Sequence, residues 1–141
     1  MVKQRASRKN CKPLTAFDAI FPAPFGKFAI CVENNLLVSS EFLPKRIKIR
    51  RARDAFTQAA VGRIQAYFSD PRVELQLPMK VLGTDFQKRV WQRLQQIPPG
   101  ETREYGQLAR ELASSARAVG NACRQNPLPI LIPCHRIVSR V

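Results

Sequence analysis

Three prolines near the C-terminal end limit the fold of this chain more than any other feature. Pro127, Pro129 and Pro133 lie within seven consecutive residues. Each fixes its own φ angle and lacks a backbone N–H, so neither a helix nor a central strand can run through the stretch. The preceding helix must therefore end at about Asn126. We expect the stretch itself to be an extended, stiff lead that delivers Cys134 to a defined place.

Cys134, His135 and Arg136 follow this lead directly. The thiolate is the reactive form of cysteine, and its share rises when positive charge lies nearby. Arg136 and a protonated His135 would supply such charge, so the string suggests a nucleophilic cysteine. A buried and inert cysteine is the alternative, and burial is the commoner fate of this residue type. Packing does not explain why the polar residues His135 and Arg136 follow Cys134, and we therefore favour a reactive cysteine.

A helix is expected upstream, beginning at Thr84. Thr84 and Gln87 fit a capping box, and the apolar residues that follow recur on one helical stripe until Pro98 ends it. Trp91 on this stripe is most simply a core residue. The stripe consists of Phe86, Val90, Trp91, Leu94 and Ile97.

Two shorter helices are expected between this helix and the prolines. The first spans about 105–113, and the second, capped by Ser114 and Ser115, runs to Asn126. Two short helices separated by so brief a turn predict a helix-turn-helix. Many helical hairpins bind nothing, so this pattern indicates nucleic-acid binding only in combination with the high positive charge of the chain.

The first half of the chain combines strand and helix patterns. Residues 28–32 and 36–42 flank Asn34-Asn35 and predict a hairpin. Asp54 can cap a helix that ends at 69–71. Its expected stripe is Phe56, Ala59, Ala60, Ile64 and Tyr67. We therefore predict a basic tail over 1–12, a small α/β unit over 13–79 and a helical domain over 80–141.

Residues 45–53 carry six basic side chains, and Ile47 and Ile49 alternate with them. Period-two alternation is typical of an amphipathic strand or a sheet edge. A solvated sheet face and a specific phosphate contact account for this charge equally well.

The net charge of the chain limits the kinds of partner that it would attract. The chain has 24 Lys and Arg against 10 Asp and Glu, a net charge of +14 that would attract nucleic acid or an anionic membrane. No apolar run approaches the roughly 20 residues that span a bilayer, and none follows the basic start as in a secretory signal. We expect a soluble, intracellular protein with no membrane partner.

The four cysteines show no CxxC spacing, and the chain has one histidine. We therefore expect free thiols and no metal site.

Several motifs occur together in a fixed order. They are Thr84-Asp85-Phe86-Gln87, Val90-Trp91, Tyr105-Gly106-Gln107-Leu108-Ala109, Arg117-Ala118-Val119-Gly120, Asn126-Pro127 and Pro133-Cys134-His135-Arg136. In this combination the sequence closely resembles the O6-alkylguanine-DNA alkyltransferases, or methylated-DNA-protein-cysteine methyltransferases. The resemblance is strong over about 80–141 and rests on general layout before that. It implies an α+β fold, in which a small α/β unit of ribonuclease-H-like type precedes an all-helical helix-turn-helix domain carrying the cysteine loop.

The resemblance also implies an activity. The alkyl group of O6-alkylguanine in double-stranded DNA, and by extension of O4-alkylthymine, would move irreversibly onto Cys134 without a cofactor. His135 would take the thiol proton through a water. Tyr105 would give a proton to N3 of the displaced base, although a tyrosine at a helix start is often only half-buried packing.

The same resemblance implies roles for further residues in and near the cysteine loop. Asn126 would tie the loop to the helix-turn-helix, unless it is an ordinary helix-ending asparagine. The carbonyls of Cys134 and Ile137 would read the exocyclic amine of guanine. We expect Arg136 to be structural or electrostatic, and Cys11, Cys31 and Cys123 to be packing residues or bystanders.

The third helix would enter the minor groove. Arg117 matches the arginine that fills the gap left by an extruded base, and its planar, permanently charged guanidinium suits that task. A solvent-facing arginine is the alternative. Small residues such as Ser115 and Ala116 would let the helix approach the backbone closely, and we expect Arg124, on the same helix, to bind DNA as well.

The family pattern continues beyond Val141 with a lid and a helix whose glutamate orients the histidine. Without them transfer is expected to be weak or absent, which leaves a lesion-binding DNA protein as the alternative. The lesion-binding relatives lack the acceptor cysteine, so Cys134 argues against that class. A protein that coats DNA or RNA is a third possibility and predicts equal affinity for damaged and undamaged duplex. We expect a monomer, located with the bacterial nucleoid or in a eukaryotic nucleus.

Overall fold

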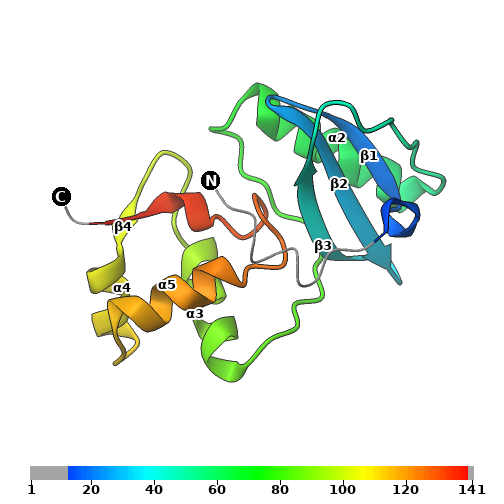
Figure 1. The fold of residues 1–141 in the computed structure, drawn as a ribbon. Coiled ribbons are helices and arrows are strands. Elements are labelled where there is room, and N and C mark those ends of the chain that lie inside the picture. The colour runs from blue at the N-terminus through cyan, green and yellow to red at the C-terminus, as the bar shows by residue number, and fades with distance from the viewer. Residues whose placement is uncertain (1–12, 140–141) are drawn as a thin grey trace. The chain divides into compact units, whose positions relative to one another are not determined.

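The computed structural model describes residues 13–139 (Figure 1). These residues form two compact units, 13–80 and 81–139. The predicted basic tail at 1–12, with Cys11, lies outside the described residues.

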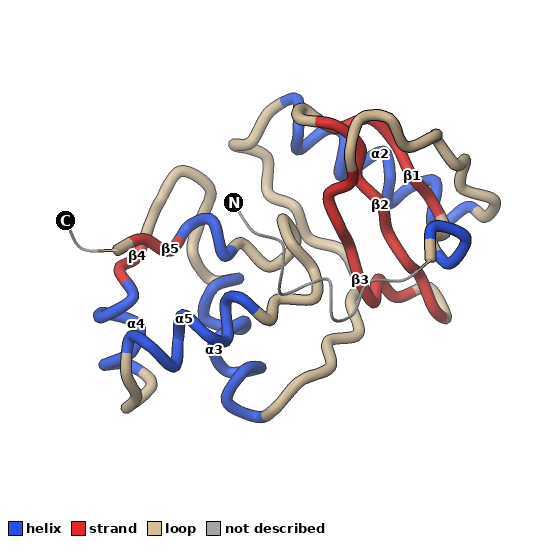
Figure 2. Tube along the Cα trace, viewed as in Figure 1, coloured by secondary structure: helices blue, strands red, loops and turns tan. Residues whose placement is uncertain are grey.

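The first unit is built on a three-stranded antiparallel sheet. A 3-10 turn, η1 (Leu14–Ala16), leads into β1 (Ala19–Ala23), β2 (Gly26–Glu33) and β3 (Leu36–Leu43), which lie in that order in the sheet (Figure 2). The predicted hairpin is confirmed: Asn34 and Asn35 join β2 to β3 with φ of 51° and 59°. Such a tight turn needs left-handed backbone at both positions, and asparagine tolerates it.

Both faces of the sheet are covered. On one face Phe28 contacts Phe21, Phe42 and Phe68 edge-on, with centroid distances of 5.9, 4.8 and 5.5 Å. Phe68 belongs to α2 (Ala55–Ser69), so this aromatic cluster attaches the helix to the sheet. Side chains of the opposite face form a second cluster, made of Phe17, Ile20, Ala29 and Cys31.

The structure corrects two sequence predictions in this unit. Residues 45–53 form no strand, because the chain turns at Pro44–Ile47 and its backbone pairs with the sheet at Arg50, which forms an isolated bridge with Ile20 of β1. On α2, Asp54 caps the helix as predicted, but Ala59 is exposed and Thr57 is buried in its place. The buried stripe of Thr57, Ala60, Ile64 and Tyr67 passes beside Ala59.

The second unit packs three helices around an apolar centre. They are α3 (Asp85–Gln95), α4 (Tyr105–Glu111) and α5 (Ala116–Arg124). The capping box of Thr84 and Gln87 is confirmed, with both reciprocal bonds present. Trp91 is 2% exposed, and its Nε1–H donates to the Ala122 carbonyl at 2.9 Å, which joins α3 to α5. The prediction that Trp91 is a core residue is therefore correct.

This unit is not entirely helical, contrary to the prediction. β4 (Arg103–Glu104) pairs in parallel with β5 (Ile137–Val138), which follows the 3-10 turn η2 (Cys134–Arg136) (Figure 2). Strands of two residues are too short to show a period in the sequence. Their pairing brings the start of α4 close to the chain that follows Cys134.

Candidate functional site

The helix-turn-helix of α4 and α5 is confirmed. Ala113 takes φ of 53°, and the Ser114 N–H donates to the Ala109 carbonyl at 2.8 Å, which closes the end of α4. Ser115 is the N-cap of α5 and accepts from the Ala118 N–H at 3.1 Å. A serine in this position satisfies a donor that the first helical turn leaves free.

The residues predicted to bind DNA lie at the exposed surface of α5. Ser115, Ala116 and Arg117 form its start, and Arg124 its last turn. Arg124 follows Arg117 by seven positions, so the two side chains lie on the same face two turns apart. Arg124 also donates to the Asn121 side chain. All four residues lie at the start of α5 or within it, and each is exposed.

The proline-rich stretch after α5 is a compact turn rather than the extended lead that we predicted. Ile130 takes φ of 77°, and the Ile132 N–H donates back to the Leu128 carbonyl at 2.8 Å. Leu128 and Ile132 are fully buried. Burial of these two apolar side chains folds the chain back, while the prolines still exclude a helix.

Asn126 links α5 to this turn and to the cysteine. Its Nδ2 donates to the Ile132 carbonyl at 2.8 Å and to Cys134 Sγ at 3.1 Å. Its Oδ1 accepts from the Leu128 N–H at 2.9 Å. One amide therefore fixes both ends of the turn and contacts the sulfur, as the family resemblance implied for a tethering residue.

Cys134 lies at the start of η2 in a largely enclosed environment. Its Sγ is 3.6 Å from the Cys123 carbonyl oxygen. A hydrogen bond to the Cys123 side chain, followed by burial and the charge of Cys123, raises the pKa of the Cys134 thiol, while the Asn126 contact opposes this. Neither Arg136 nor His135 is among the groups that shift this pKa, so activation of the thiol by their charge stays a prediction.

The surroundings of His135 favour its neutral form. Partial burial and the nearby Arg136 guanidinium lower its pKa from 6.5. A neutral imidazole offers no positive charge to the thiol, but it keeps a nitrogen that can accept a proton.

Tyr105 begins α4 and faces the same group of side chains. Burial, together with the charges of Cys123 and Cys134, raises the pKa of its hydroxyl. The ring lies against α5, since a Cβ added at Gly120 would be 3.9 Å from Tyr105 Cε1. Tyr105 and Cys134 therefore meet at one site, although they are far apart in the sequence.

Arg136 and Ile137 hold η2 in place. The Arg136 guanidinium donates to the Ile97 carbonyl, beyond the end of α3, at 2.8 Å. Ile137 is 5% exposed, and its N–H donates to the Cys134 carbonyl. Ile137 also pairs with Arg103 of β4.

Cys123 is the site residue that sequence reasoning missed. It lies on the last turn of α5, is partly buried and contacts Cys134. Val119, Ala122 and Cys123 follow helical i, i+3, i+4 spacing, which places the third residue beside the buried face. That spacing could have indicated that Cys123 points inward toward the segment that follows the helix.

Residues 13–139 contain neither a metal-binding cluster nor a membrane-spanning helix. There, no group of three or more histidine, cysteine, aspartate or glutamate side chains could hold a metal ion. No helix of that part of the chain is long and apolar enough to cross a membrane.

Comparison with known proteins gives a consistent result. Residues 85–141 match the family described as 6-O-methylguanine DNA methyltransferase, DNA binding domain. A methylated-DNA-protein-cysteine methyltransferase of Methanosarcina acetivorans is 34% identical over 87% of this chain and 83% of its own length. Another relative of the same description, from Mycobacterium leprae, is 40% identical over 75% of this chain, and the match covers 65% of that relative.

Solved structures agree with these matches. Mycobacterium tuberculosis OGT, crystallised in complex with DNA, is 35% identical and superposes with a TM-score of 0.72, covering 85% of this chain and 76% of that one. The fold and the site thus define an α+β methyltransferase-type protein with a helix-turn-helix DNA-binding domain. The chain belongs to the methylated-DNA-protein-cysteine methyltransferase family.

Proposed function

We propose that this protein repairs DNA by moving the alkyl group of O6-alkylguanine, and also of O4-alkylthymine, onto its own Cys134. The new bond joins Cys134 Sγ to the alkyl carbon, and the bond from that carbon to the base oxygen breaks. Each molecule reacts once because the thioether is stable. Duplex DNA is the partner, and a single chain is the working unit.

Two neighbouring groups handle the protons in this proposal. The thiol proton passes to His135, whose lowered pKa keeps the imidazole in its proton-accepting form. Tyr105 supplies a proton to the departing base, and its raised pKa keeps the phenol protonated until then. Departure of a neutral base avoids the build-up of negative charge in a partly buried site.

DNA binding is assigned to α5. Its exposed start, Ser115 and Ala116, carries no bulk, so the helix can approach a groove closely. Arg117 takes the place of the extruded base, and Arg124 contacts the backbone two turns away. The minor groove offers few base-specific contacts, which suits a protein that acts in any sequence.

The contact between Asn126 and Cys134 carries the proposal. The Asn126 amide donates to the acceptor sulfur and to the Ile132 carbonyl, so the DNA-binding helix and the thiol are held in one fixed relation. A hydrogen bond donated to sulfur also favours the thiolate, which the reaction needs.

Intact mass spectrometry tests the proposal directly. Protein mixed with excess duplex containing O6-methylguanine should gain one methyl group, located by peptide mapping at Cys134. Cys134→Ser should gain none, and an undamaged duplex provides the blank. A methyl group on another residue, or no gain with folded protein, would reject Cys134 as the acceptor.

The raised pKa of Cys134 favours a second candidate, a protein that binds the lesion without transfer. A thiol that stays protonated attacks alkyl carbons slowly. This candidate predicts tighter binding to the methylated duplex than to the undamaged one, with no mass change. Equal affinity for both duplexes would instead indicate a DNA-coating protein.

A further inference from the structure

The first unit carries a dense group of cations that the proposed reaction does not use. We call residues 45–53 the basic segment. Its six cationic residues are Lys45, Arg46, Lys48, Arg50, Arg51 and Arg53. All but Arg50 are exposed, and none forms an ion pair with a carboxylate in residues 13–139. The adjacent Asp54 is engaged at 2.7 Å by the Thr57 N–H as the cap of α2.

The backbone of this segment is held against the sheet. Arg50 and Ile20 exchange two hydrogen bonds, of 2.9 and 3.0 Å, and the Ile47 N–H donates to the Pro44 carbonyl at 3.1 Å. Lys27 donates to the Lys45 carbonyl at 2.5 Å. The Ile47 side chain packs on the cluster that contains Ile20. Since the backbone is already ordered, binding through these cations costs little further backbone entropy.

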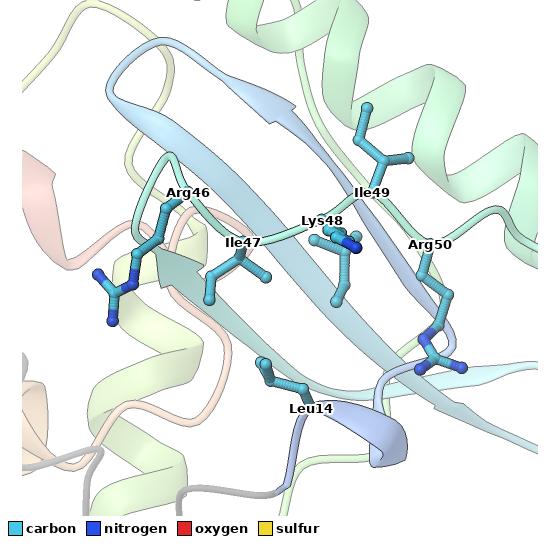
Figure 3. Close-up of a pocket in the computed structure, with 7 residues that line it drawn as sticks. Leu14, Arg46, Ile47, Lys48, Ile49 and Arg50 are labelled. Carbon is cyan, nitrogen blue, oxygen red and sulfur yellow. The ribbon is translucent and has the colours of Figure 1, made fainter.

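A cavity of about 430 Å³ lies between the basic segment and Leu14 of η1. Figure 3 shows Leu14 and Ile47 pointing toward each other, with Arg46 and Arg50 at opposite ends of the labelled stretch. The Arg50 Nε is buried and makes no hydrogen bond within the described residues. The lining residues are Leu14, Ile20, Arg46, Ile47, Lys48, Ile49 and Arg50.

This combination of surfaces fits the backbone of a nucleic acid. Phosphates alternate with less polar sugars along a strand, and the basic segment places the exposed Ile49 between Lys48 and Arg50. An anionic membrane surface would require larger apolar anchors, whereas Ile49 is the one large hydrophobic residue of the segment that is exposed, at 56%. A regular polyanion therefore suits the segment better than a lipid surface.

We propose that the basic segment binds the sugar-phosphate backbone of duplex DNA, as a second contact in addition to α5. The inference extends the proposed function, since it takes duplex DNA as the partner. Backbone contacts carry no sequence information, so this contact strengthens binding to damaged and undamaged duplex alike. Its effect is to keep the protein on DNA while α5 samples base pairs.

The test compares two double variants of the full chain that each lose two positive charges from the first unit. Arg46→Gln with Lys48→Gln changes the basic segment. Arg63→Gln with Lys80→Gln changes two exposed cations outside it and is the control. Fluorescence anisotropy measures the affinity of each protein for an undamaged duplex over a series of salt concentrations, and thermal unfolding checks that both variants fold.

We expect the segment variant to bind about tenfold or more weakly at 0.1 M salt. Its plot of log affinity against log salt should be shallower by about 1.8, since each phosphate contact contributes about 0.9. The control should keep the slope of the unaltered protein. Equal losses in both variants, or an unchanged slope in the segment variant, would overturn the proposal.

Anionic vesicles and single-stranded RNA serve as competing partners in the same assay. Loss of binding to either of them by the segment variant, with unchanged duplex binding, would overturn the proposal in favour of that partner. The duplex assay contains no alkylated base, so failure of methyl transfer to Cys134 would leave its result unaffected. The two proposals can therefore fail independently.

Discussion

The carbonyl oxygen of Cys123, on the last turn of α5, lies 3.6 Å from Cys134 Sγ. The two thiols also interact, and this interaction is the largest contribution that raises the pKa of Cys134 and lowers that of Cys123. The proposed acceptor is therefore linked to a second cysteine on α5.

Cys123→Ala should make Cys134 more reactive. Removing the Cys123 side chain removes the largest cause of the raised pKa, and each unit by which the pKa falls increases the thiolate about tenfold at neutral pH. Carbamidomethylation by iodoacetamide, followed by peptide mapping, measures the rate at Cys134. Cys123→Ser retains a hydrogen-bonding group and serves as the control, with a smaller expected change. An unaltered or lower rate in the alanine variant would refute this role of Cys123.

The lowered pKa of His135 predicts a pH dependence of stability. Below pH 6.5 the unfolded chain takes up a proton on this imidazole, whereas the folded protein resists it until a lower pH. The free energy of unfolding therefore falls as the pH drops through 6.5 and below. His135→Gln removes this component, so urea titrations should show a smaller fall for the variant. The same fall in both proteins would exclude His135 as a source of the pH dependence.

Local signals in the sequence were sufficient for much of the second unit. Capping residues and helical spacing predicted α3, and Ser115 marked the start of α5. These features rest on interactions between residues three or four apart, which a sequence displays directly. The buried position of Trp91 followed from the same spacing.

Other features of the structure had no clear local signal in the sequence. The strand β1 contains Pro22, which weakens any strand signal, and it pairs with β2 across a short turn at residues 24–25. The charge state of Cys134 depends on Cys123, eleven positions earlier, and on burial that only the folded chain supplies. The sequence therefore indicated a cysteine with two polar neighbours, but not the contacts that its sulfur makes with Asn126 and Cys123.

Tyr105→Phe should slow methyl transfer and leave duplex binding nearly unchanged. The phenylalanine ring retains the packing near Gly120 but cannot give a proton to the departing base. Loss of a general acid lowers the rate by about 100-fold or more. Rapid-quench measurement of transfer, alongside anisotropy for binding, separates the two effects. A parallel loss of rate and of affinity would assign Tyr105 a structural role instead.

Arg117→Ala should slow transfer from duplex DNA much more than transfer from the free alkylguanine base. Only the duplex requires a side chain to occupy the gap of an extruded base, and extrusion costs a few kcal/mol. We expect a reduction of about tenfold or more for the duplex. Arg63→Ala, which removes an exposed arginine of the first unit, is the matched control. Equal reductions on duplex and free base would contradict a role in extrusion.

Asn126→Ala should impair both folding and transfer. The substitution removes two donated hydrogen bonds, to the Ile132 carbonyl and to Cys134 Sγ, and leaves the Leu128 N–H without its acceptor. An unsatisfied buried group costs about 1–3 kcal/mol, which urea denaturation can measure. Asn126→Asp separates the two roles, because its carboxylate still accepts from Leu128 but donates nothing to the sulfur. We therefore expect the aspartate variant to unfold at a higher urea concentration than the alanine variant while transferring methyl no faster. If the aspartate variant transferred methyl at the original rate, the contact between Asn126 and Cys134 would have no part in the reaction.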